Sequence, residues 1–161
     1  MKRLSLAALA AALALAALPA SAHQGIHVFD PYVRIVAGSG VVYFVIENHA
    51  DQDDTLVAAA SDAAMTMLMN STEDANGVMR MTPVPEGFAI KSRDICLLAS
   101  AGDHVMLSGV PGTYKDGDTI AVLLTFEKAG QISLTIPIDN SRRTTPGMGP
   151  TPFDAESIAV K

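Results

Sequence analysis

Methionine is concentrated in one short part of the chain. Residues 65–81, MTMLMNSTEDANGVMRM, contain five of the eight methionines in the 161-residue sequence. A hydrophobic core does not need this density of thioethers, because Leu and Ile fill volume with better-defined rotamers. Farther along the chain, His104 and Met106 form a His-x-Met pair. Thioethers with one imidazole favour a soft metal, and Cu(I) is the ion that such a set of donors selects.

The spacing of these residues predicts which of them could meet. On a β-strand, residues two apart share a face, with Cα atoms roughly 6.5 Å apart. Met65, Met67 and Met69 would then share one face, and Met79 and Met81 would share another. The polar stretch NSTEDANG between them could close a hairpin, and the His-x-Met pair likewise shares a face. Packing remains the alternative, because alternating methionines often fill a core and the histidine could simply bond a buried carbonyl.

The rest of the chain predicts the elements that would hold these side chains. Short β-branched or alternating runs are separated by turn residues such as GSG, VPEG and KAG, and no helix-period stretch of useful length lies between them. Short strands at this spacing predict an all-β protein, a two-sheet antiparallel sandwich. We expect strands near residues 32–36, 41–48, 55–60, 64–70, 77–81, 95–99, 104–109, 119–127 and 131–138.

The first 22 residues have the layout of a secretory signal peptide: two cations, an apolar stretch and a final Ala-Ser-Ala. We expect cleavage after residue 22, export to the periplasm, a β-sandwich domain over residues 23–139 and a flexible tail over residues 140–161. A retained membrane anchor is the alternative, although the apolar run is short for a membrane span. Cleavage lowers Lys+Arg from 11 to 9 against 17 Asp+Glu, a net charge of −8. An acidic chain without a basic stripe is a poor candidate for binding nucleic acid or an anionic membrane.

Cys96 is the only cysteine of the sequence, and it is flanked by Ile and Leu. One cysteine can form neither an internal disulfide nor a Cys-based zinc site. We expect Cys96 to be a buried small hydrophobic residue rather than a reactive thiol. Thioether ligands would suit an oxidising compartment, because they form no disulfides.

Between residues 30 and 138, the segments YFVIENHADQDDTLVAAAS, GVMRMTPV, GDHVMLSGV and YKDGDTIAVLLTFEKAGQISLTIPI resemble the periplasmic Cu(I) chaperones of the PCuAC domain family. The family's motif is a His or Met, about ten residues, a Met, about twenty-one residues and then His-x-Met. Met81, His104 and Met106 match its last three positions. The gap before His104 is one residue longer than usual.

This resemblance leaves two candidates for the first ligand. Strict spacing places Asn70 there, whereas one extra residue in the hairpin places Met69 there. Asn is a poor copper ligand, so we expect Met69, which would complete a Met3His site biased toward Cu(I). Weaker candidates are Asn70 itself, Met67, Met79 and His23.

The resemblance also implies a fold and a function. The expected fold is a cupredoxin-like or immunoglobulin-like sandwich of the Greek-key type. The expected function is delivery of Cu(I) to a cuproprotein such as cytochrome oxidase during its assembly, without enzymatic activity and without insertion into a membrane.

Two other functions remain open. Signal cleavage would make His23 the mature N-terminus, whose amine and imidazole could chelate Cu(II), with His27 or His49 adding a second ring. That arrangement would be typical of a copper oxygenase with an N-terminal histidine brace. The other alternative is a metal-free structural sandwich that has lost copper binding. In the tail, Met148 could catch copper.

Overall fold

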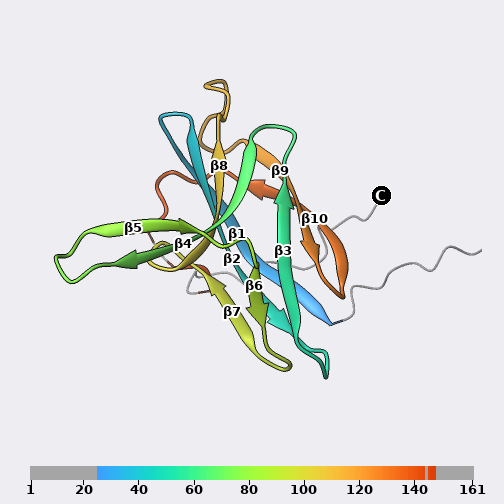
Figure 1. The fold of residues 1–161 in the computed structure, drawn as a ribbon. Helices are drawn as coiled ribbons and strands as arrows, with labels where there is room; N and C mark the ends of the chain where they lie inside the picture. The colour runs from blue at the N-terminus through green and yellow to red at the C-terminus, as the bar shows by residue number, and fades with distance from the viewer. Residues whose placement is uncertain (1–24, 144, 148–161) are drawn as a thin grey trace, which may run out of the picture.

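The protein is described here by a computed structural model covering residues 25–143 and 145–147. Those residues form ten strands in two antiparallel sheets (Figure 1). The strands are β1 (Ile26–Val36), β2 (Ser39–Asn48), β3 (Asp54–Ala60), β4 (Met65–Glu73), β5 (Met79–Pro83), β6 (Phe88–Ile90), β7 (Ile95–Leu98), β8 (Asp103–Ser108), β9 (Thr119–Phe126) and β10 (Gly130–Pro137). No helix in this described part is long and apolar enough to cross a membrane.

The two sheets make the predicted sandwich. The first sheet has the order β1-β2-β8-β4-β5, and β7 also pairs with β2. The second sheet has the order β10-β9-β3-β6. In Figure 1, β3, β9 and β10 lie on one side of the molecule, and the β4–β5 hairpin projects away from the other. At the hairpin end, β4 and β5 therefore pair with each other and lie away from the strands of the second sheet.

The core explains which face of each strand is available for other chemistry. Strands β9 and β10 alternate buried and exposed residues, as expected when one face of a sheet packs against another sheet. In the first sheet, the inward residues include Leu68 of β4 and Val105 and Leu107 of β8, all of which are buried. Because side chains alternate along a strand, the residues beside them point outward.

Two features of the strands were not predicted. Strand β1 begins at Ile26, six residues before the predicted start, because it continues through an irregularity at Asp30 and Pro31. Its pairing with β2 shifts register between Phe29 and Tyr32, and Asp30 has a φ of 50°. Strand β6 is only three residues long, too short to be recognised from its pattern.

The start of the predicted tail lies against β1. Arg142 forms an ion pair with Asp30 through both terminal guanidinium nitrogens, and its guanidinium carbon lies 4.1 Å from the centre of the Tyr32 ring. The backbone N–H of Gly147 also donates to Asp30 at 2.8 Å. Burial alone would raise the pKa of Asp30, but the hydrogen bonds from Arg142 and Gly147 lower it overall. The signal peptide, His23 and Met148 lie outside the described residues.

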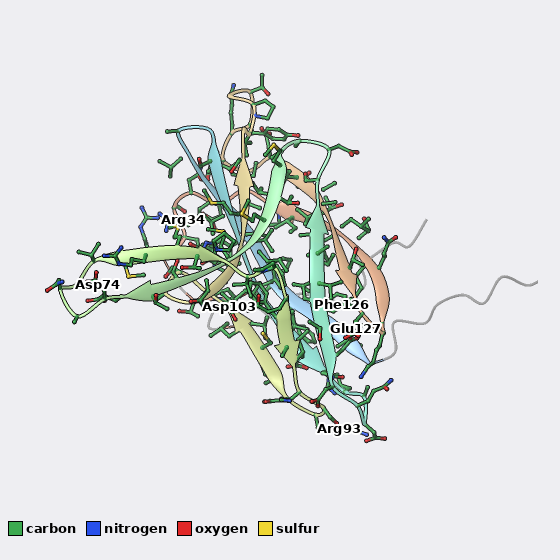
Figure 2. All side chains as sticks on the ribbon, in the orientation of Figure 1. Arg34, Asp74, Arg93, Asp103, Phe126 and Glu127 are labelled. Carbon is green, nitrogen blue, oxygen red and sulfur yellow. The ribbon has the colours of Figure 1, made fainter. Side chains whose placement is uncertain are left out.

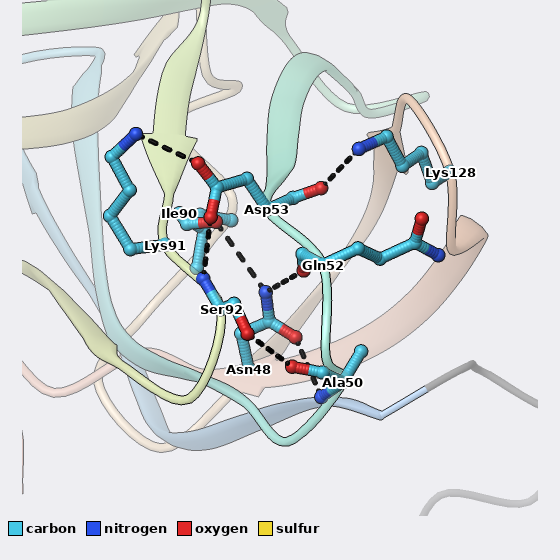
Figure 3. Close-up of polar contacts among 8 residues, drawn as sticks. All are labelled: Asn48, Ala50, Gln52, Asp53, Ile90, Lys91, Ser92 and Lys128. Carbon is cyan, nitrogen blue, oxygen red and sulfur yellow. Dashed lines mark hydrogen bonds and ion pairs between the residues drawn. The ribbon is translucent and has the colours of Figure 1, made fainter.

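A network of polar contacts joins the loop between β2 and β3 to the residues around the end of β6 (Figure 3). Asn48 is buried; its amide donates to the carbonyl of Gln52 at 2.9 Å, and its Oδ1 accepts from the Ala50 N–H at 2.9 Å. The Asp53 carboxylate accepts from Lys91 and from the backbone N–H of Ser92, each at 2.8 Å. Because the side chains of Asn48 and Asp53 are already hydrogen-bonded, mostly to backbone groups, this region offers a stable base rather than a set of free ligands.

Candidate metal site

Strand register brings the predicted ligands to one face. β4 lies between β8 and β5, and Met69 pairs with His104 while Met67 pairs with Met106. Residues directly opposite in an antiparallel pair share a face, with Cβ atoms about 4.5–5.5 Å apart. Leu68 is buried on the inward face, so its neighbours in β4 point outward. The outward face of the first sheet thus carries Met65, Met67, Met69, Met79, Met81, His104 and Met106.

Met81 joins this set through the outer pair of strands. It lies on β5 opposite Ser71, and Met69 is two residues before Ser71 on the same face of β4. Met69 and Met81 are therefore diagonal neighbours, within reach of two long side chains.

The hairpin turn is held by Asp74, which Figure 2 labels at its tip. Its carboxylate accepts from the backbone N–H groups of Asn76 and Val78 at 2.9 and 3.1 Å, and from Arg80 Nε at 3.1 Å. These hydrogen bonds, the backbone ones first, lower the pKa of Asp74. Gly77 supplies a φ of 78° in the same turn. This local chemistry fixes the register that sets β5 beside β4.

Asn70 and Met69 point to opposite faces. The side-chain amide of Asn70 donates to Asp103 Oδ1 at 2.6 Å, across the β4–β8 pair that also aligns these two residues. Met69 lies on the face that carries His104. The structure thus separates the two candidates for the first ligand by face. That Met69 binds a metal remains a prediction.

His104 is an outward-facing residue that is nevertheless 1% exposed. Its Nδ1 lies 3.0 Å from the carbonyl oxygen of Gly102. A carbonyl can only accept, so Nδ1 donates to it, and in the neutral form of the ring Nε2 is the nitrogen with the lone pair. Among the described residues, this buried Nε2 has no hydrogen-bond partner. Leaving a buried polar atom unpaired costs about 1–3 kcal/mol, so the position needs an explanation, and a bound metal is one.

Aromatic side chains flank His104 on the β2 side. The Tyr43 ring centroid lies 6.4 Å from that of His104, and the Tyr32 ring lies 5.2 Å beyond Tyr43. Burial raises the pKa of Tyr43, although the nearby Arg34 partly opposes this shift. The tyrosine hydroxyls therefore stay neutral, and the rings place apolar surface against one side of the imidazole.

Two histidines proposed for a second copper site, His27 and His49, lie on β1 and in the loop after β2. The His27 and His49 ring centroids are 5.0 Å apart, and His49 Nε2 lies 2.9 Å from the Glu47 carboxylate. Within residues 25–143 and 145–147, no three His, Cys, Asp or Glu side chains are grouped so that they could hold a metal. A brace at His23 remains a prediction about residues that the structure does not describe.

Sequence reasoning missed three residues of this face. They are Gly102, whose carbonyl orients the imidazole, Tyr43, and Ser71, which is buried and whose hydroxyl has no hydrogen-bond partner in the described part. The alternation that placed Met69 outward would also have placed Ser71 outward. Tyr43 could not be found this way, because its proximity to His104 depends on pairing between distant strands, and Gly102, although only two residues before His104, contributes a backbone carbonyl that its residue type does not reveal.

Comparison with solved structures defines the class of protein: a β-sandwich of the PCuAC type. CuI-DR1885 from Deinococcus radiodurans has a TM-score of 0.58 and 28% identity, covering 70% of this chain and 77% of that one. The apo form of DR1885 has a TM-score of 0.55 and 28% identity, covering 74% and 83%. The copper-bound PCuAC domain from PmoF2 has a TM-score of 0.58 but 20% identity, covers 71% and 92%, and supports the fold alone.

The chain belongs to the LpqE-like family. Residues 26–138 match the family described as "Putative lipoprotein LpqE-like". A curated relative, "Putative lipoprotein Lxx21020" of Leifsonia xyli subsp. xyli, is 30% identical over 129 residues, which cover 75% of this chain and 77% of that protein. The resemblance and the fold predicted from the sequence are both confirmed.

Proposed function

We propose that this protein binds Cu(I) on the outward face of its first sheet and passes the ion to another protein. The proposed ligands are Met69, Met81, His104 and Met106. The observation that carries the proposal is the buried, unpartnered Nε2 of His104, directly across the strand pair from Met69. The copper named in two of the matched structures, CuI-DR1885 and the PmoF2 domain, supports the same choice of metal.

The donor set suits a carrier rather than an enzyme. Thioethers and a neutral imidazole bind Cu(I) without losing protons, and thioethers bind it more weakly than thiolates do. The hydrogen bond from His104 Nδ1 to Gly102 fixes the ring and would leave Nε2 to bind the metal, a common arrangement for ligating histidines. Transfer would proceed by ligand exchange, with no change of oxidation state.

The proposed location is outside the cytoplasm, in the periplasm if the cell has one. The signal-peptide pattern of residues 1–22 supports export, as does the lipoprotein name of the family and of the relative. By analogy with PCuAC chaperones, we propose that the recipient of Cu(I) is cytochrome oxidase during its assembly.

An anaerobic Cu(I) titration with X-ray absorption tests the site. We expect one tightly bound Cu(I) with three sulfur neighbours and one nitrogen neighbour. The double variant His104→Ala/Met106→Ala should lose that ion. His49→Ala, which removes an exposed histidine remote from the methionines, is the matched control and should bind as the wild type does. Unchanged stoichiometry in the double variant would refute the site, and no binding by the wild type would refute the function.

A further inference from the structure

Two methionines outside the proposed ligand set extend it along β4. Met67 lies directly opposite Met106, and Met65 follows two residues away on the same outward face. Opposed residues have Cβ atoms about 4.5–5.5 Å apart, and residues two apart on a strand lie roughly 6.5 Å apart at Cα. Met106, Met67 and Met65 therefore form a continuous line of thioethers running from the proposed site along the sheet.

Exposure increases along this line. His104 is 1% exposed, Met106 is half-buried, Met67 is 48% exposed and Met65 is 74% exposed. The line of thioethers thus starts at half-buried Met106, beside the buried His104, and ends at Met65, a side chain open to solvent.

Packing does not account for the outer two methionines. Burying a Met side chain fully stabilises a protein by about 1.5–3 kcal/mol, and Met67 and Met65, at 48% and 74% exposed, gain only part of it. An exposed thioether is also vulnerable to oxidation to the sulfoxide. The sulfur atoms of Met65 and Met67 therefore suggest a role that an aliphatic side chain could not fill.

We propose that Met106, Met67 and Met65 form an exit path along which bound Cu(I) moves to a partner that offers sulfur ligands. This inference rests on the proposed Cu(I) site. Each bond to copper that breaks is replaced by one that forms: Met67 sulfur replaces His104 Nε2, sulfur ligands of the partner replace Met81 and Met69, Met65 sulfur replaces Met106, and a further partner sulfur replaces Met67. The copper remains Cu(I) throughout, and no proton leaves this protein's donors, because they are neutral thioethers and an imidazole nitrogen that binds through its lone pair. At Met65 the partner's sulfur replaces the last ligand.

The test compares Met65→Leu/Met67→Leu with Met79→Leu. Met79 is an exposed methionine of the same face (46%), but it lies on β5 opposite Glu73, away from Met106. Leu conserves volume and removes the sulfur, so these exposed changes should leave the fold intact. Each protein is first titrated with Cu(I), and the loaded protein is then mixed with an excess of a peptide containing two methionines while transfer is followed by stopped flow.

We expect the double variant to bind one Cu(I) with the wild-type affinity but to transfer it about tenfold more slowly, or slower still. Met79→Leu should transfer at the wild-type rate. As a second readout, methyl resonances of Met65 and Met67, labelled with ¹³C, should broaden or shift in the Cu(I)-loaded wild type while that of Met79 does not.

Normal binding with unchanged transfer in the double variant would overturn the exit path while leaving the proposed function intact. Equal slowing in Met79→Leu would also overturn it, because the effect would then follow methionine content rather than position. Absence of Cu(I) binding by the wild type would overturn both proposals, and the titration reveals this before any transfer is measured.

Discussion

Met69 and Asn70 offer the sharpest test of the proposed site, because these consecutive residues point to opposite faces of β4. Met69→Leu keeps the volume of a half-buried side chain, so the free energy of unfolding of the copper-free protein should fall by less than about 1 kcal/mol. It removes one sulfur from the proposed ligand set. Mutation of residues that merely support metal ligands costs about 10–100-fold in affinity, so losing a ligand should weaken Cu(I) binding at least tenfold.

Asn70→Ala should lower the stability of the copper-free protein but leave its affinity for Cu(I) unchanged. It removes the 2.6 Å hydrogen bond to Asp103. A hydrogen bond to a charged group contributes about 1.5–3 kcal/mol, and partial exposure of this pair reduces that to about 1 kcal/mol. For a domain of this size the melting temperature should fall by roughly 3–6 °C. Affinity for Cu(I) should not change, because the Asn70 side chain lies on the other face from His104.

Two measurements separate these effects: denaturant unfolding of the copper-free proteins, and anaerobic competition for Cu(I) against a chromophoric chelator. Thr72→Ala, an exposed change on the same strand and on the same face as Asn70, is the control and should leave both quantities unchanged. If Asn70→Ala lost copper while Met69→Leu kept it, the metal-binding face of β4 would be the other one, and the register argument would be refuted.

Three further predictions concern the frame of the domain. Asp30→Asn should lower the free energy of unfolding by about 1–3 kcal/mol by breaking the ion pair with Arg142, as measured by denaturant unfolding at pH 7. The pKa of Asp30 is lower in the folded state than its unfolded value of about 4. The ionised carboxylate therefore makes its full contribution to the free energy of unfolding above about pH 4, and this contribution is lost as the pH falls toward the folded-state pKa. The difference in free energy of unfolding between wild type and variant should accordingly narrow below about pH 4. Cys96, whose pKa is raised to about 11, first by burial and then by nearby carboxylates, should react with iodoacetamide at pH 8 about a hundredfold more slowly than an ordinary thiol; a comparable rate would contradict its partly buried environment. Phe44→Ala, which empties a fully buried position, should destabilise the protein by about 3–5 kcal/mol in denaturant unfolding, and a loss under 1 kcal/mol would contradict the packing described.

Strand existence was largely predictable, because strands such as β9 and β10 alternate cleanly between core and solvent. The predictions failed where the pattern was interrupted or short. In β1, the predicted strand began only at residue 32, after Asp30 and Pro31, yet the strand continues through both, and Asp30 forms an ion pair with Arg142, more than a hundred residues away. In β6, three residues are too few to show a period.

The candidate site was predictable in composition but not in arrangement. Spacing by two placed Met65, Met67 and Met69 on one face, which local geometry alone determines. His104 lies opposite Met69 only because β8 pairs with β4. This pairing depends on how strands distant in the sequence join, and no local pattern of residues predicts it. The hydrogen bond from His104 Nδ1 to the Gly102 carbonyl is local, but it involves a backbone group, so residue types gave no signal of it.

The alternation of β4 limits how this region can change in length. Inserting or deleting one residue between Met65 and Met69 would turn every side chain on one side of the change to the opposite face, sending sulfur into the core and Leu68 toward solvent. Length changes are therefore tolerable inside the strand only in steps of two, and single-residue changes must fall in the turns, such as the one that Asp74 closes. Relatives should accordingly be aligned by which face of the sheet a residue occupies. An alignment made by counting residues would place Asn70 in the first ligand position, whereas an alignment made by face would place Met69 there.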